Sequence, residues 1–225
     1  MHSVSNIDSL TLLVEEGQAD INKICMRDQR SPLLCMLRNS SSDPQIISKL
    51  LEYGPDITIK DKEGNGPLHL LLKQSRTELS TLTALLAVGA DPNERNRAGQ
   101  TPLLAMQSRF ESSTETVDIL LKAGADINAR SHTGKTLLTT ANLNEISGLI
   151  EKGADIGVRD YRGRTLLHHA IASHKGTKSS VTLSRPNGNH RFDVLLGLDM
   201  DVKAVDYRGN TLMHELASRR DVLDS

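Results

Sequence analysis

Aromatic residues are scarce in this sequence. They make up 2% of its 225 residues, and tryptophan does not occur at all. The hydrophobic share of 37% therefore consists mainly of Leu, Ala, Ile and Val. This composition favours aliphatic packing between helices and disfavours a β-sandwich built on aromatic anchors.

The sequence also lacks features that would direct it to a nucleic acid, a membrane or an oxidising compartment. Its formal net charge is −1, so no overall field attracts polyanions. No run of about 18 apolar residues is present, so no membrane span is expected. The N-terminus shows no secretory pattern, and the two cysteines, Cys25 and Cys35, fit no metal spacing. These features indicate a reducing compartment, cytoplasmic or nuclear.

Motifs of catalysis are missing as well. The sequence contains no G-x-S-x-G, no phosphate-binding loop, no G-x-G-x-x-G and no H-E-x-x-H. A looser group of histidines, at 168, 169, 174 and 190, has poor spacing for a metal ion. We therefore predict no enzyme, no cofactor and no metal site.

What the sequence does contain is an internal repeat. A short block recurs as SPLL, GPLH, TPLL, TLLT, TLLH and TLMH, beginning at residues 31, 66, 101, 136, 165 and 211. A second pattern, of the type GADIN, precedes each block. Its aspartate lies 11 residues before the second residue of the block in five pairs and 12 in the first. Two patterns that shift together identify a repeated structural unit.

Each block has the features of a helix start. Thr or Ser can cap the helix, as at Ser31, Thr101, Thr136, Thr165 and Thr211, and proline often occupies the first helical position. Leucines then begin an apolar face. A second helix follows, as in residues 113–124, and ends at glycine. A polar segment closed by glycine comes next and predicts a hairpin-like finger.

This unit of finger, helix and helix resembles the ankyrin repeat. The nearest matches are GQTPLLAM (99–106) with ILLKAGADIN (119–128), and GNGPLHLLL (64–72) with LLAVGADPN (85–93). The resemblance implies an all-α ankyrin-repeat solenoid of stacked helix pairs with fingers along one edge. It also implies a concave face made by fingers and first helices, which usually binds proteins, and no shared catalytic residues.

We predict a single array over residues 1–225. A partial repeat spans 1–22, full repeats span about 23–57, 58–92, 93–127, 128–156 and 157–202, and a partial repeat spans 203–225. The half-repeats at the two ends indicate either a section of a longer array or degenerate terminal caps.

Three departures from the repeat are expected to alter local structure. The first finger carries Gln29 in place of glycine and one extra residue. The fourth repeat is short, so its first helix must be brief. The fifth repeat holds an insertion at 174–191, rich in Gly, Ser, Pro and Asn, which predicts a loop between its helices.

Two sets of recurring polar residues are interpreted as architectural. His69, His168 and His214 share one repeat position, and successive repeats lie about 10 Å apart, so they cannot converge on one ion. We expect each histidine to bond the neighbouring finger. The aspartates of the GADIN pattern recur in the same way and are interpreted as turn residues.

The candidate contact residues lie mainly in the last repeats. Two finger tips carry Tyr followed by Arg, both favoured at protein interfaces, and residues 159–191 contain seven basic residues against one acid. The predicted partner-binding set is Tyr161, Arg162, Arg164, His169, Tyr207, Arg208, Arg97, Lys175, Lys178 and Arg185.

Three functions remain open. The first, which we favour, is a non-catalytic interaction module or scaffold, monomeric, for an unidentified protein partner. The second is the targeting or regulatory part of a larger enzyme or multidomain chain. The third is an anion-binding module that uses the basic 159–191 region for an acidic peptide, a phosphate or a lipid head group. Nucleic-acid binding is not favoured, because aromatics do not alternate with the basic residues.

Amide hydrogen exchange is expected to be fastest in residues 1–25, 174–191 and 211–225, because these segments carry the least repeat packing. Exchange measured by mass spectrometry would check this. Protection of 174–191 equal to that of the second helices would contradict its assignment as a loop.

Overall fold

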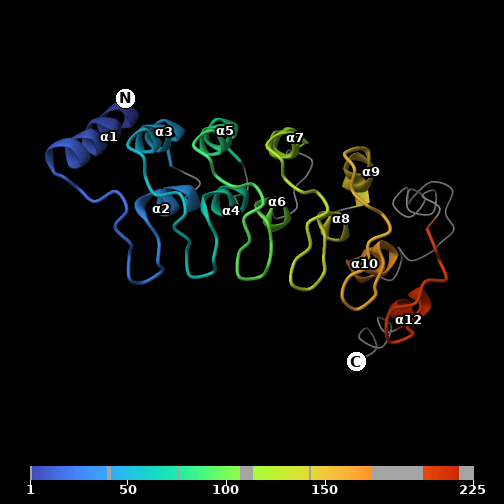
Figure 1. Cartoon of the computed structure of the whole chain (residues 1–225). Coiled ribbons are helices and arrows are strands. Elements are labelled where there is room, and N and C mark those ends of the chain that lie inside the picture. The colour runs from blue at the N-terminus through green and yellow to red at the C-terminus, as the bar shows by residue number, and fades with distance from the viewer. Residues whose placement is uncertain are drawn as a thin grey trace. The chain divides into compact units, whose positions relative to one another are not determined.

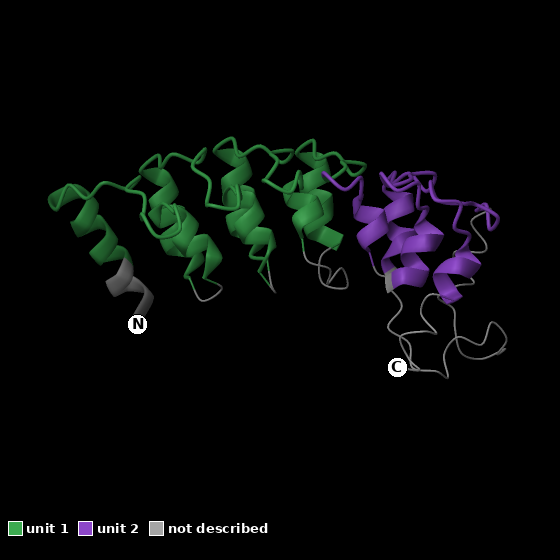
Figure 2. Ribbon diagram, turned by 90° about the horizontal axis from the view of Figure 1, so that it is seen from below, with its two compact units in different colours: residues 1–131 green, residues 132–225 purple. Residues whose placement is uncertain are grey.

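A computed structural model of the chain describes residues 2–39, 42–74, 77–106, 114–141, 143–173 and 200–217. It divides into two compact units, residues 1–131 and 132–225 (Figure 2). The described residues are helical. Their β-structure consists of two isolated bridges, Cys25 with Arg30 and Val205 with Thr211. The predicted all-α class is confirmed.

In the first unit, short inner helices alternate along the chain with longer outer helices. The inner helices are α2 (Pro32–Arg38), α4 (Pro67–Leu72) and α6 (Pro102–Ala105). The outer ones are α3 (Pro44–Glu52), α5 (Leu79–Ala87) and α7 (Thr114–Lys122), preceded by α1 (His2–Thr11) and a π-helical turn, η1 (Leu12–Glu16). Figure 1 shows one row of inner and one row of outer helices, with the fingers projecting beyond the inner row. Within each row, neighbouring helices pack against each other.

The second unit continues the same alternation. Its inner helices are α8 (Leu137–Thr140), α10 (Leu166–Ser173) and α12 (Leu212–Ala217), and its outer helix is α9 (Leu143–Glu151). Helix α10 packs against both α8 and α12. The brevity of α8 was predicted, whereas the equally short α6 was not. The insertion at 174–191 and the second helix expected after it lie outside the described residues.

Leucines of the inner helices form the core. The third residue of each block is at most 3% exposed in Leu33, Leu68, Leu103, Leu138 and Leu167. The apolar face predicted from the sequence is therefore the packed face. Met213 occupies this position in α12 and is the exception, with 70% of its surface exposed.

The predicted helix caps are confirmed at two positions. The hydroxyl of Ser31 accepts a hydrogen bond from Leu34 N at 3.4 Å, and that of Thr101 accepts one from Leu104 N at 3.3 Å. At Thr136 the prediction was wrong. The Thr136 hydroxyl is buried without a hydrogen-bond partner among the described residues, and the Thr139 hydroxyl instead accepts from Thr136 N at 2.9 Å.

At Thr165 and Thr211 a histidine also bonds to the start of the helix. The hydroxyl of each threonine lies 2.9 Å from the Nδ1 atom of the histidine three residues later. The same Nδ1 atom accepts the backbone N–H of the threonine, at 3.3 Å in His168 and 3.2 Å in His214. The imidazole thus binds the first backbone N–H of the helix start, as the fourth residue of a capping box does.

The first finger closes despite its missing glycine. Its bridge joins Cys25 to Arg30, one residue more than the hydrogen-bonded pair Asp61–Asn65 of the next finger. Gln29 adopts a φ of 56°, in the left-handed region that Gly64 occupies in the next finger with a φ of 76°. The side chain at residue 29 therefore carries a backbone strain that glycine would not.

Replacing Gln29 with glycine is expected to raise the free energy of unfolding by about 1 kcal/mol, since the left-handed strain is relieved and part of the gain is lost to the flexibility of glycine. Gly64→Ala is the reverse kind of change, because it adds a side chain at the equivalent position of the next finger. A Cβ there would lie 2.9 Å from Arg97 N at an unfavourable φ, so we expect a loss of about 2 kcal/mol. Urea unfolding measures both, and equal effects of the same sign would contradict the assignment.

Candidate functional site

The fingers form a lattice held by backbone hydrogen bonds. One N–H at each tip donates to a carbonyl of the preceding finger, in the pairs Arg97 to Glu63 at 3.0 Å, Tyr161 to Thr133 at 3.4 Å and Tyr207 to Arg162 at 2.9 Å. Inside the last two of these fingers, Asp160 and Asp206 accept N–H groups from residues two and four positions later. The tips are therefore presented on a rigid support.

The aspartates of the GADIN pattern are also architectural, as predicted. Asp56, Asp91, Asp126 and Asp155 each accept the backbone N–H two residues later at 2.8 Å. In addition, the amide group of Asn93 accepts from Asp126 N and donates to Gly124 O, both at 2.8 Å. These carboxylates stabilise turns between repeats.

Tyr161 and Tyr207 lie at equivalent finger tips in the second unit. Each ring lies directly against the glycine of the preceding finger. A Cβ added at Gly134 would be 2.9 Å from Tyr161 Cδ1, and one at Gly163 would be 2.6 Å from Tyr207 Cδ1. Nevertheless 62% of Tyr161 and 75% of Tyr207 remain exposed. One face of each ring is therefore held while much of the ring stays accessible.

The arginines beside these tyrosines are exposed. The backbones of Arg162 and Arg208 bond to Asp160 and Asp206. Among the described residues, neither guanidinium has a recorded hydrogen bond or ion pair. Arg97 occupies the tip position that corresponds to the tyrosines, and its side chain lies over Gly64. These charges are available to a ligand.

Arg164 and His169 are placed differently. Arg164 Nε donates to Asp160 Oδ2 at 2.9 Å, and His169 Nε2 lies 3.1 Å from the same oxygen. Burial opposes ionisation of Asp160, but the N–H groups of Arg164 and Arg162 outweigh it and hold the pKa of that carboxyl below its usual range. This cluster stabilises the base of a finger.

The basic 159–191 region is only partly described. Arg159 Nη1 donates to Gly163 O at 3.0 Å and to Val205 O at 2.9 Å, so this arginine connects two fingers. Lys175, Lys178 and Arg185 lie outside the described residues. Anion binding through this region stays a prediction.

Two of the three histidines of the repeated block, His69 and His168, bond the neighbouring finger, as predicted. His69 is fully buried, and its Nε2 atom lies 2.9 Å from Gln100 O, while Nδ1 accepts Gly66 N at 3.3 Å. His168 Nε2 lies 3.4 Å from Asn210 O. Both rings connect an inner helix to the finger that follows it.

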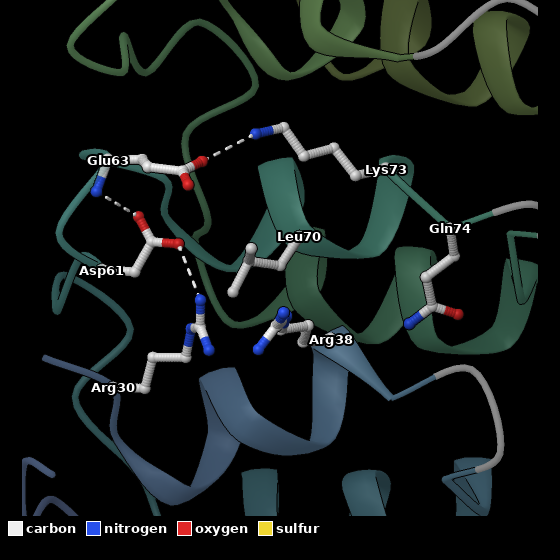
Figure 3. A pocket seen from close by; sticks show the side chains of 7 residues that line it. All are labelled: Arg30, Arg38, Asp61, Glu63, Leu70, Lys73 and Gln74. Atoms are coloured by element: carbon white, nitrogen blue, oxygen red, sulfur yellow. Dashed lines mark hydrogen bonds and ion pairs between the residues drawn. The ribbon is translucent and has the colours of Figure 1, made fainter. Parts of the chain in front are cut away.

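A charged pocket in the first unit was missed in the sequence. It lies between α2, α4 and their fingers, and Figure 3 shows the residues that line it: Arg30, Arg38, Asp61, Glu63, Leu70, Lys73 and Gln74. The sequence does contain an indication of this pocket, because Arg38 and Lys73 each lie seven residues after the start of their blocks. Basic residues at one repeat position in adjacent repeats fall beside each other once the repeats stack.

No group of His, Cys, Asp and Glu in the described segments is arranged to hold a metal ion. None of their helices has the length and hydrophobicity to cross a membrane.

Stacked pairs of short helices with fingers along one edge define a helical repeat array, a class that presents an extended binding surface. A family model described as ankyrin repeats, in three copies, matches residues 34–131. This part of the chain belongs to the ankyrin-repeat family, and the fold is an all-α ankyrin solenoid. Ankyrin repeats are generally protein–protein interaction modules and typically non-catalytic. No curated protein matches the chain.

Folding stability is expected to fall in mildly acid solution. Burial lowers the pKa of His69 and of His169, and the Arg164 guanidinium lowers that of His169 further. Below about pH 6.5 the unfolded chain then binds more protons than the folded chain does. The free energy of unfolding therefore decreases as the pH is lowered, by at most about 1.4 kcal/mol per pH unit for each histidine.

Urea unfolding between about pH 7.5 and pH 5.5 measures this dependence. His69→Gln should reduce it, whereas His132→Gln, at an exposed position, should leave it unchanged. An unchanged pH dependence in His69→Gln would contradict the assignment.

Proposed function

We propose that this chain is a non-catalytic protein-binding module that contacts its partner through the fingers and inner helices of the second unit. The central contacts are the tip pairs Tyr161–Arg162 and Tyr207–Arg208. The observation that carries this proposal is the exposure of both tyrosines, 62% and 75%, on adjacent fingers joined by the bond from Tyr207 N to Arg162 O.

Residue chemistry supports these tips as anchors. Tyr and Arg are enriched among residues that dominate binding energy, since each offers a large contact area together with a directional polar group. The chain has three tyrosines in all. The remaining one, Tyr53, donates its hydroxyl to Glu15 at 2.7 Å within the first unit and is not at a finger tip.

Rigidity supports the same conclusion. The glycine contacts fix one face of each ring, and the aspartate turns fix the backbone of each finger. A partner that binds such preorganised side chains loses little conformational entropy from them. The inner helices behind the fingers would extend the surface toward the size of a standard protein interface.

A photo-cross-linking amino acid, p-benzoylphenylalanine, placed at position 207 is expected to capture a discrete protein from a cell extract. The matched control carries the same amino acid in place of Val88, an exposed residue after an outer helix. Capture of the same proteins with equal yield at both positions would contradict the proposed surface.

The captured protein, once purified, provides a quantitative test. The double variant Tyr207→Ser with Arg208→Ser is expected to bind it at least tenfold more weakly, because two anchors are removed. The control double variant, Val88→Ser with Lys122→Ser, changes the outer helices and should bind as the unmodified chain does. Equal affinity of the two double variants would refute the assignment.

A further inference from the structure

The charged pocket of the first unit is separate from the finger tips considered above. It has a volume of about 310 Å³ and opens between two inner helices and their fingers. Arg38 ends α2, Leu70 lies in α4, and Lys73 and Gln74 follow α4 (Figure 3). The Gln74 side chain donates to Leu37 O, which ties the end of α4 to α2 beside the pocket.

Arg30 places a buried guanidinium in the lining of this pocket. Its side chain is only 8% exposed, and Nη1 pairs with Asp28 at 2.6 Å. Nη2 lies 3.8 Å from Asp61 Oδ2, too far for a hydrogen bond. Its Nε atom is buried without a hydrogen-bond partner among the described residues. The positive charge of Arg30 is therefore held in the pocket with part of its bonding capacity unused.

Arg38 supplies a second guanidinium, which is exposed. Among the described residues it has no recorded hydrogen bond or ion pair. Figure 3 shows its side chain directed into the pocket beside Leu70, from the α2 side. A planar guanidinium with free N–H groups suits a carboxylate, which it can bind through two parallel hydrogen bonds.

The acidic residues of the pocket are already occupied. Asp61 accepts Glu63 N and Asn65 N, both at 2.9 Å, and Asn65 Nδ2 at 3.1 Å. Glu63 pairs with Lys73 at 3.4 Å. Of the three cationic side chains in the lining, Arg30 is paired with Asp28 and Lys73 with Glu63, which leaves Arg38 without an ion pair among the described residues.

We propose that this pocket binds a single carboxylate, the side chain of an Asp or Glu in an acidic segment of a partner protein. One unpaired guanidinium matches a monocarboxylate better than a phosphate dianion, which Asp61 and Glu63 would repel. The buried Leu70 offers an apolar wall to the methylene groups of the ligand. The pocket lies between fingers and inner helices, where an extended segment of a partner protein could reach it.

The probe for this proposal is a short fluorescein-labelled peptide of alternating Glu and Gly. Its neutral counterpart is a peptide of alternating Gln and Gly. Fluorescence anisotropy with the full chain is expected to show saturable binding of the acidic peptide at about 10 mM salt and weaker binding at about 150 mM. The neutral peptide should not bind. Glutarate at the same carboxylate concentration should compete poorly, because it makes no contacts outside the pocket.

Arg38→Gln is expected to weaken acidic-peptide binding about tenfold, because a charge-assisted hydrogen-bonded pair is lost. Arg27→Gln is the matched control. It removes the same charge from an exposed residue of the first finger that does not line the pocket, and it should change affinity less than twofold. Circular dichroism confirms that both variants are folded.

Three outcomes would overturn the proposal. One is the absence of saturable binding at low salt. Another is an equal effect of Arg38→Gln and Arg27→Gln, which would indicate only general attraction. The third is complete displacement by glutarate, which would indicate a small-anion site instead. The variants Tyr207→Ser and Arg208→Ser leave this pocket unchanged, so failure here and failure of the proposed tip surface are distinguishable.

Discussion

The stacking of one inner helix on the next is the constraint on which the rest of this structure depends. An inner helix of four to eight residues is too short to be stable alone. It gains stability by burying its leucines, such as Leu68 and Leu103, against its neighbours. Every repeat must therefore keep the same apolar face, while its fingers and helix ends are free to carry other residues.

Polar connections between repeats then decide which side chains remain available. Arg95 and Arg159 both donate to a carbonyl of their own finger and to one of the next, so their charges are used in the scaffold. Arg164 is used in the same way by Asp160. Arg38, Arg162 and Arg208 lack such partners among the described residues. A basic residue in this chain is thus informative about binding only once its place in the lattice is known.

The finger tips combine support with exposure. Glycine is needed at residues 134 and 163 because of their positive φ, and also because the rings of Tyr161 and Tyr207 occupy the space of a side chain there. This contact holds each ring without burying it. In the first unit, Arg97 takes the corresponding place over Gly64, so the same geometry presents a charge in one unit and an aromatic ring in the other.

The repeat, the all-α class, the leucine face and the architectural role of recurring His and Asp residues could all be predicted from the order of residues alone. These properties depend on short-range residue patterns or on the repetition of such patterns, and both can be recognised in a sequence. The sequence also located the Tyr–Arg tips, because finger tips follow from the turn pattern.

The hydrogen-bond and ion-pair partners of individual polar groups, by contrast, depend on the tertiary structure. The Thr136 hydroxyl makes no capping bond among the described residues, and the Thr139 hydroxyl instead accepts the Thr136 N–H. Arg164 and His169, predicted as contact residues, meet at Asp160 through the fold of one finger onto its helix. The pocket of Arg30, Arg38 and Lys73 arises from residues of adjacent repeats. Such contacts depend on three-dimensional register, which the spacing of residues along one chain does not contain.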